Sequence, residues 1–218
     1  MKKLILLVVL AFVGVQAHAQ LVGGAGYLHT IETTSGGGSS ESVHFNGFYV
    51  GASYNIGLLP GLGVAPGFYV NMLLRNESSS AGGSAAGLSL QGNYREVALN
   101  LPVNLTYSYD ITPNVALRLF AGPTFQYGII SKTTVSGTVN VSIFGMHFNY
   151  TDGSQVNHYD AEHGTRNPFN IYLGGGAGVQ VGDILFTVGY DHNLLDVDKL
   201  QGGKTRRNCI KAGVNFVF

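Results

Sequence analysis

Strict alternation of apolar and polar residues dominates the middle of the chain. From Val97 to Tyr109 every odd position is apolar or aromatic, while the even positions carry Ala, Asn, Pro, Thr and Ser. After the short segment 110–114 the same period returns from Val115 to Tyr127. Because the side chains of a strand point alternately to opposite faces, this period predicts two long strands joined by a tight turn.

Six further segments carry the same alternation, some of them more weakly. The expected strands comprise residues 21–31, 48–56, 62–74, 97–109, 115–127, 170–181, 184–190 and 210–218. The pattern therefore predicts an all-β fold of eight antiparallel strands.

The connections between these strands alternate in length. The long connections lie near residues 32–45, 76–93, 130–169 and 193–206, and the short ones lie near residues 57–61, 110–114 and 181–183. Transmembrane β-barrels have short periplasmic turns and longer extracellular loops, and an even strand count places both termini at the short-turn end. The Gly/Ser-rich stretches 35–43 and 77–87 are expected to be mobile external loops.

Alternation alone does not show which face of the sheet meets water, but the residue types do. A soluble eight-stranded barrel would carry Lys and Glu on its polar face. Here that face consists of Gly, Asn, Ser and Thr, which suit a narrow barrel interior, and the other face carries Tyr54, Tyr107, Tyr109, Phe125 and Tyr127 near strand ends. In hydrocarbon only a closed sheet pairs all of its backbone groups. We therefore expect a closed antiparallel eight-stranded transmembrane β-barrel.

Two features qualify this prediction. Pro66, Pro102 and Pro123 lie inside expected strands, where each removes a backbone donor, so we expect β-bulges there. The long segment 130–169 contains an alternation of its own around residues 134–143. It predicts either a hairpin that protrudes from the barrel or two further strands of a ten-stranded barrel. We prefer the protruding hairpin, because its apolar stretches are short and no clear second strand follows.

The first residues predict export. A basic start at residues 2–3 precedes an apolar run at residues 4–15, and Ala17-His18-Ala19 matches a signal-peptidase site. The apolar run of about 12 residues is shorter than the roughly 20 that a membrane-spanning helix needs. We expect residues 1–19 to be a cleaved signal peptide and residues 20–218 to form an outer-membrane β-barrel domain.

Charge and composition exclude other classes of protein. The 12 Lys+Arg and 12 Asp+Glu are 11% of the 218 residues, against roughly 25% in a soluble domain. Without the signal peptide, 10 basic and 12 acidic residues remain, and no basic block could neutralise a nucleic-acid backbone. The single Cys209 allows no disulfide within the chain. We expect a monomer in contact with outer-membrane lipid, with no nucleic-acid partner and no cofactor.

Charged residues are also expected inside the barrel. Parity places five of them on the inner face: Arg75, Glu96, Arg118, Asp191 and Lys211. Because burial without a partner is expensive, we expect Arg75 to pair with Glu96 and Asp191 to pair with Lys211. A selectivity filter or proton path is the functional alternative. Eight strands leave an interior that side chains can fill, so a structural plug is preferred.

The chain offers one arrangement that resembles a paired acid and base. Asp191 and His192 lie near the expected mouth, followed by Asp196 and Asp198. Adjacent strand residues point to opposite faces, which argues against cooperation between the first two. We therefore expect no catalytic residue and no enzyme activity.

Four residues of the third long connection could bind a metal ion, namely His158, Asp160, Glu162 and His163. Their spacing matches no specific site pattern. A solvated loop is the preferred interpretation, and no metal site is predicted.

Three short segments resemble a known family. They are LNLPVNL at residues 99–105, FAGP at residues 120–123 and GVNFVF at residues 213–218, and they resemble the bacterial outer-membrane protein β-barrel domain family, including PorT-like and small porin-like barrels. The likeness spans most of residues 20–218, implies the outer membrane of a Gram-negative cell and carries over no catalytic residue. Phe216 and Phe218 match a C-terminal signal that barrel-assembly machinery reads in such families, which implies that machinery as a partner.

The expected function follows from location and fold. We expect a non-enzymatic barrel that anchors external loops, and these loops would contact a surface ligand or another envelope protein. One alternative is a narrow porin-like channel for small solutes. A less favoured alternative is a lipid-modifying or proteolytic barrel enzyme.

Overall fold

The computed structural model of the protein describes residues 19–82, 86–143, 146–160, 164–199 and 203–218. The expected signal peptide, apart from Ala19, lies outside these residues. The described part forms strands β1 (Ala19–Gly36), β2 (Ser39–Leu59), β3 (Leu62–Gly82), β4 (Ala86–Thr112), β5 (Val115–Ile143), β6 (Met146–Asn157), β7 (Phe169–Val181), β8 (Ile184–Asn193) and β9 (Lys204–Val217). In this part of the chain no helix is long and apolar enough to cross a membrane.

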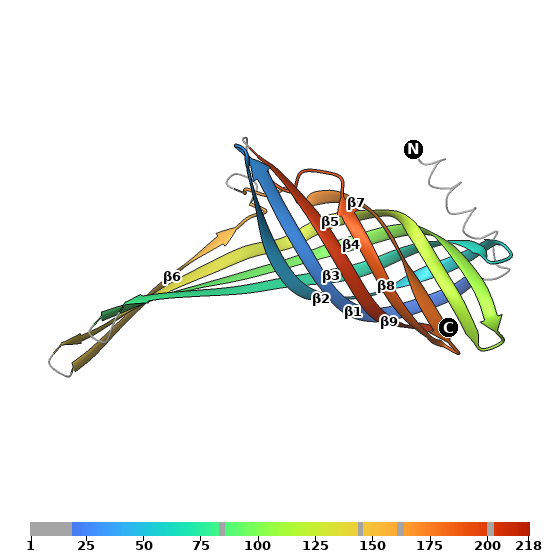
Figure 1. Cartoon of the computed structure of the whole chain (residues 1–218), viewed down its shortest axis with the longest axis horizontal. Helices are drawn as coiled ribbons and strands as arrows, with labels where there is room; N and C mark the ends of the chain where they lie inside the picture. Colours follow the sequence, from blue (N-terminus) through green and yellow to red (C-terminus); the bar gives the residue numbers. More distant parts are fainter. Residues whose placement is uncertain (1–18, 83–85, 144–145, 161–163, 200–202) are drawn as a thin grey trace.

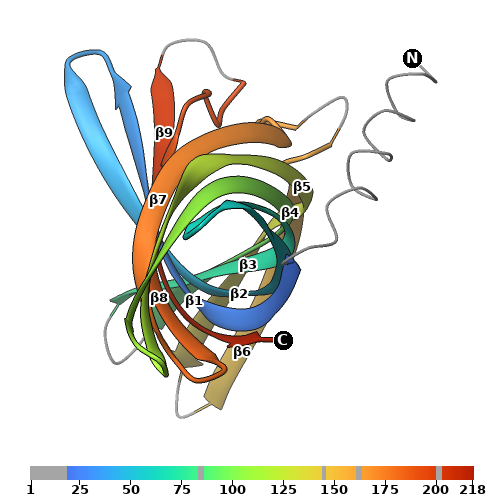
Figure 2. The same cartoon turned by 90° about the vertical axis from the view of Figure 1, so that its right-hand side faces the viewer.

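Eight of these strands close into a ring. Each pairs with the next in the order β1-β2-β3-β4-β5-β7-β8-β9, and β9 pairs back onto β1 (Figure 2). Every pairing is antiparallel. Strand β6 pairs with the end of β5 outside the ring. The predicted eight-stranded barrel is confirmed, and the ten-stranded alternative is wrong.

The two faces of the ring differ as the alternation predicted. Outward side chains are large and apolar, and they include Phe48, Val50, Phe68, Leu105, Phe186, Val188 and Ile210. The predicted aromatic residues are also exposed on this face: Tyr54, Tyr107, Tyr109, Phe125 and Tyr127. Buried inward side chains are largely polar, and they include Thr30, Asn100, Thr124, Gln126, Asn170 and Asn215. The apolar band therefore faces lipid and the polar face fills the interior.

Large inward side chains lie opposite glycines. A Cβ on Gly213 of β9 would overlap the hydroxyl group of Tyr49, which reaches across from β2. A Cβ on Gly189 of β8 would come within 3.3 Å of the Phe120 ring. Glycine is therefore needed where an aromatic ring occupies the narrow lumen.

The proline positions require a correction. Pro66 pairs with Val103, Pro102 pairs with Thr124 and Pro123 pairs with Leu173, and the register is the same on both sides of each proline. The register shifts instead between Val97 and Ala98, as well as at two positions next to short turns. The predicted bulges at the prolines are wrong, because a proline can lose one ladder hydrogen bond without an inserted residue.

The predicted long loops are largely strands. Strands β1 and β2 continue to a two-residue turn at Gly37 and Gly38, whose φ angles of 59° and 83° fall in the left-handed region that favours glycine. Strands β3, β4 and β5 likewise run far beyond the apolar band (Figure 1). The expectation that 35–43 and 77–87 are loops is therefore wrong for their described residues, apart from the turn at Gly37 and Gly38, and their expected mobility stays a prediction. Positions 83–85 of the second stretch lie outside the described residues.

These extensions form a second structural unit, which we call the projecting sheet. It comprises residues 76–82 of β3, 86–95 of β4, 132–143 of β5 and all of β6. It leaves the ring at the end where the long connections lie, and Figure 1 shows it extending well beyond the barrel. We call this end of the molecule the long-hairpin end and the opposite one the short-turn end.

Candidate functional site

Four charged side chains meet inside the barrel near the long-hairpin end. We call Glu32 of β1, Glu96 of β4, Arg207 of β9 and Arg166 of the β6–β7 connection the ion network. Arg207 donates hydrogen bonds to Glu32 Oε2 at 2.8 Å and to Glu96 Oε1 at 2.7 Å. Arg166 donates to Glu32 Oε1 at 2.7 Å and lies 3.6 Å from Glu96 Oε2. Each arginine therefore bridges both carboxylates.

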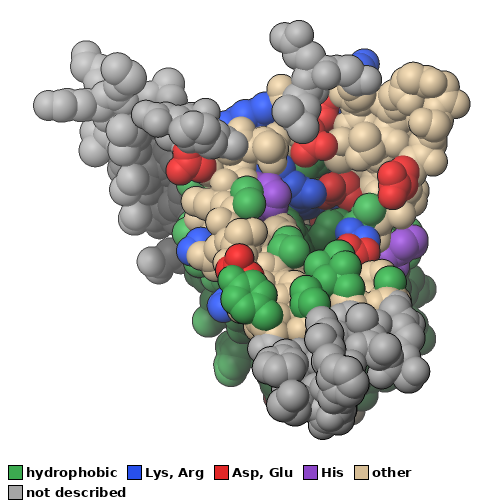
Figure 3. All heavy atoms as spheres, turned by 90° about the vertical axis from the view of Figure 1, so that its left-hand side faces the viewer, with side chains coloured by type: hydrophobic (Ala, Val, Ile, Leu, Met, Phe, Trp, Pro, Cys, Tyr) green, Lys and Arg blue, Asp and Glu red, His purple; other side chains and the backbone are tan. Residues whose placement is uncertain are grey.

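The ion network closes the lumen at its level. Strands β4 and β9 lie on opposite sides of the ring, so the contact between Glu96 and Arg207 spans the barrel. The side chains of Glu96 and Arg207 are only 1% and 2% exposed. Both side chains are therefore buried within the lumen at this level. Figure 3 shows acidic and basic side chains gathered in the hollow of this end.

Tyr94 of β4 supports the ion network from one side. Its hydroxyl group donates to Glu96 Oε2 and accepts a hydrogen bond from Arg166 Nη1 at 2.8 Å. The Arg166 guanidinium also lies 5.1 Å from the centre of the Tyr94 ring. These contacts satisfy donors and acceptors that would otherwise be buried without partners.

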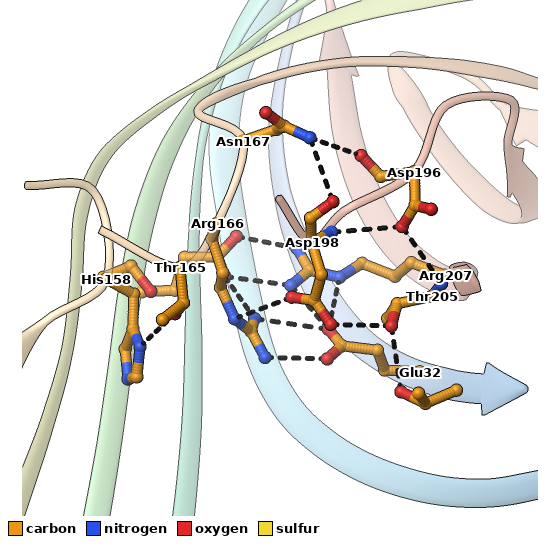
Figure 4. A network of polar contacts seen from close by, with 12 residues as sticks. Glu32, His158, Thr165, Arg166, Asn167, Asp196, Asp198, Thr205 and Arg207 are labelled. Atoms are coloured by element: carbon orange, nitrogen blue, oxygen red, sulfur yellow. Dashed lines mark hydrogen bonds and ion pairs between the residues drawn. The ribbon is translucent and has the colours of Figure 1, made fainter. Parts of the chain in front are cut away.

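The β6–β7 and β8–β9 connections lie next to the ion network (Figure 4). Asn167 in the β6–β7 connection donates to the backbone oxygen of Asp196 at 3.0 Å in the β8–β9 connection. Asp198 Oδ2 accepts from Thr205 Oγ1 at 2.6 Å, and Arg166 pairs with Asp198 through an isolated β-bridge. The two connections are thus tied to each other and to the ring.

His158 begins the β6–β7 connection. It contacts Thr133 Oγ1 through Nε2 at 2.7 Å and Thr165 Oγ1 through Nδ1 at 3.0 Å. Burial, and then the nearby positive charge of Arg166, lower the pKa of His158 below its ordinary value.

This shift predicts that acid loosens the connection. A histidine whose pKa is lower in the folded state binds fewer protons there than when it is released, so stability falls as the pH drops through its ordinary pKa of about 6.5. We expect hydrogen exchange of residues 158–160 and 164–167 to be several-fold faster at pH 5 than at pH 7.5, after correction for intrinsic exchange. His158→Gln should remove most of this dependence. An equal pH dependence in both proteins would contradict the assignment to His158.

A cavity of about 160 Å³ lies inside the barrel on the short-turn side of the ion network. Its polar lining includes Asn55, Asn71, Asn100, Asn104, Thr106, Thr124 and Asn215. The Arg118 side chain of β5 crosses the ring near the short-turn end. It donates to Gln180 of the neighbouring strand β7 at 2.9 Å and to Gln20 of the opposite strand β1 at 3.2 Å. Arg118 is therefore part of the cavity lining and bridges the barrel there.

The structure places the predicted interior charges as follows. Asp191 and Lys211 form an ion pair on neighbouring strands. The expected pair of Arg75 and Glu96 does not form. Arg75 instead forms an ion pair with Glu77 at the mouth of the barrel and lies over the Phe45 ring. It is two residues farther along β3 than Leu73, the cross-strand partner of Glu96, and Glu96 is already paired with Arg207.

Sequence reasoning missed three members of the ion network. Glu32 and Arg207 keep the inward parity of strands whose predicted ends were too short, at residues 31 and 210. Continuing that parity past the last apolar residue would have found both. Arg166 lies outside the ring strands, so no periodic pattern marked it.

The other candidate residues show no catalytic or metal arrangement in the described part. Asp191 faces inward, whereas His192 on the outer surface contacts Asn208 at 2.7 Å. No group of three or more metal-capable side chains occurs among the described residues, and Glu162 and His163 lie outside them. Phe216 and Phe218 are exposed, so they are accessible, and their role as an assembly signal stays a prediction.

The comparisons with known proteins concern most of the chain. The sequence profile described as "Outer membrane protein beta-barrel domain" matches residues 16–199. No curated protein matches the chain. Similar solved structures include Ail, the attachment invasion locus protein of Yersinia pestis, in complex with the heparin analogue sucrose octasulfate. That structure has 14% sequence identity and a TM-score of 0.37, and the match covers 91% of this chain and 99% of that chain. Neisserial surface protein A has 16% identity over 92% and 99% of the two chains and a TM-score of 0.37. The outer membrane protease OmpT of Escherichia coli has 12% identity over 93% and 97% and a TM-score of 0.31.

Proposed function

Because the chain belongs to the outer membrane protein beta-barrel domain family, we propose that it is a non-enzymatic membrane anchor whose closed barrel holds the projecting sheet outside the cell. The sheet is the working surface, and its partner is a surface ligand or another envelope component. The observation that carries this proposal is the ion network, which closes the barrel beneath a sheet that extends beyond it.

Two further features support an anchor. The short turns and the C-terminus lie at one end of the barrel, and the sheet lies at the other, which is the arrangement of barrels with periplasmic turns and extracellular loops. Within the described ranges the sheet also has two free edges, since residues 76–82 of β3 and all of β6 each pair there with only one strand. Free edges offer unpaired backbone groups to a partner.

Selective labelling of cysteines tests the placement. Ser154 lies on the exposed surface of β6, and Asp183 lies in an exposed short turn. We expect Ser154→Cys to react with a membrane-impermeant maleimide on intact cells, whereas Asp183→Cys should react only after the outer membrane is opened. Native Cys209 is only 7% exposed, so its background labelling should be low. The reverse pattern would overturn the proposed orientation.

A variant without the sheet tests the anchor role. Joining Asn76 to Asn93 and Thr133 to Val156, which are cross-strand partners, removes most of the sheet and keeps the ring. We expect the heat-dependent gel shift of the folded barrel to persist in this variant. Loss of that shift would show that the sheet is part of the barrel's stability rather than a separate working surface.

A further inference from the structure

The outward face of the strands changes character where the projecting sheet begins. On the ring, this face carries apolar residues up to the cross-strand row of Met72, Val97 and Ile130. One row farther out, Leu74 lies beside Arg95 and Lys132. Beyond them the described residues of the same face are polar or glycine. The row of Arg95 and Lys132 therefore marks the level at which hydrocarbon gives way to lipid headgroups.

Arg95 and Lys132 form an unusual pair at this level. They are direct cross-strand partners on β4 and β5, so their side chains leave the sheet on the same face about 5 Å apart. Like charges placed directly opposite each other are destabilising. Among the described residues no carboxylate pairs with either of them, because Glu77 and Asp152 have the opposite parity and belong to the other face. Within the described part of the chain the pair therefore has no carboxylate to offset its charge, and it can take an anion from outside.

The rows above the two cations offer hydrogen bonds without charge. The first row contains Asn76, Asn93, Thr134 and Gln155, and the second contains Ser78, Gln91, Ser136 and Gly153. Apart from a 3.4 Å contact between Gln155 Nε2 and Thr134 Oγ1, no side-chain hydrogen bond joins members of these rows in the described structure. The other side-chain amide and hydroxyl groups of these two rows can bind a ligand rich in hydroxyl groups.

We propose that this face binds a phosphorylated glycolipid of the adjacent leaflet. A phosphate lies between Arg95 and Lys132, the sugar hydroxyls meet the amide and hydroxyl rows, and the acyl chains follow the apolar band below. Arginine and lysine are the residues that bind phosphate oxygens. The position of the cations, directly above the lipid-facing band and continuous with it, favours a membrane lipid over a soluble anion. This inference does not depend on whether the projecting sheet also binds a protein.

Lipid binding by the full mature chain tests the proposal. The barrel is refolded in nanodiscs of neutral phosphatidylcholine that contain one added probe lipid, and co-purified lipid is counted by native mass spectrometry. The probes are lipid A, which is a diphosphorylated disaccharide lipid, and phosphatidylglycerol, which has a phosphate without a saccharide. We expect lipid A to bind more tightly than phosphatidylglycerol. Arg95→Gln/Lys132→Gln should weaken lipid A binding by about thirtyfold, since each cation near the surface contributes about fivefold.

Matched variants separate the possible causes. Lys199→Gln/Lys204→Gln removes the same charge from exposed positions at the same end and should leave lipid A binding unchanged. Asn93→Ala/Gln155→Ala should weaken lipid A binding but not phosphatidylglycerol binding. Competition by inorganic phosphate at millimolar concentration, with no preference for either lipid, would show an anion site without a lipid and overturn the proposal. Equal lipid A binding by the wild type and Arg95→Gln/Lys132→Gln would also overturn it.

Discussion

Arg207→Met is expected to lower the free energy of unfolding of the barrel by about 3–5 kcal/mol, because it leaves two buried carboxylates without their shared cation. Arg207 contacts Glu32 and Glu96, and all three side chains are at most 6% exposed. Water cannot replace the lost hydrogen bonds at such a depth. Denaturant unfolding of the refolded protein in detergent micelles or vesicles, followed by the heat-dependent gel shift, would measure the change.

A matched arginine shows whether the loss reflects burial. Arg75 also pairs with a glutamate, but its side chain is 29% exposed and that of Glu77 is 62% exposed. Arg75→Met should therefore cost only about 1 kcal/mol. Adding Glu96→Gln to Arg207→Met should recover a large part of the loss, because the remaining charges, Glu32 and Arg166, still pair with each other at 2.7 Å. Similar losses for Arg207→Met and Arg75→Met would contradict the assignment of the ion network as a buried structural plug.

The second large effect is expected in conductance. The wild-type barrel should be silent in a planar bilayer, because the ion network fills the lumen from β4 to β9. Replacing all four members with alanine removes two positive and two negative charges together and empties this layer. A small cavity lined by Arg207 shares Asn71 and Asn100 with the main cavity, so the emptied layer would join both. We expect stable stepwise conductance from this fourfold variant.

The control for conductance is a pair that does not span the barrel. Asp191 and Lys211 lie on neighbouring strands, so Asp191→Asn/Lys211→Gln should stay silent. A wild-type barrel with steps of its own would refute the closed anchor and favour the narrow channel. If the fourfold variant folds and stays silent, Arg118 is the remaining closure, and adding Arg118→Ala should then open it. Silence in that variant too would show that the lumen is closed by the general packing of the interior.

Strand prediction succeeded where lipid acts on one face only. From Val97 to Tyr109 the outer face meets hydrocarbon and the inner face meets the barrel lumen, so the period of two is visible in the residue types. In the projecting sheet both faces are exposed, and residues 76–81 are Asn, Glu, Ser and Ala. This stretch of β3 has no apolar face and therefore no amphipathic period, so its Ser-rich sequence resembled a loop.

The alternation of side chains along each strand was not enough to predict which interior charges form ion pairs. Parity correctly turned Glu96 and Lys211 inward, and neighbouring strands brought Lys211 to Asp191. The partner of Glu96 came from the opposite side of the ring and from a connection without a periodic pattern. Which residues meet across a barrel depends on how far each strand is shifted along its neighbour, and this stagger accumulates around the closed ring.

The amino-acid sequence by itself therefore determined the class of fold, the number of ring strands, the lipid-facing surface and the end at which the long connections lie. Each of these follows from local alternation, because a bilayer imposes one solvent on one face of every strand. Only the tertiary structure decided that the predicted loops form a projecting sheet, that Arg166 and Arg207 close the lumen with Glu32 and Glu96, and that Arg95 lies beside Lys132. These arrangements depend on register between strands that are distant in sequence, and a local pattern does not encode it.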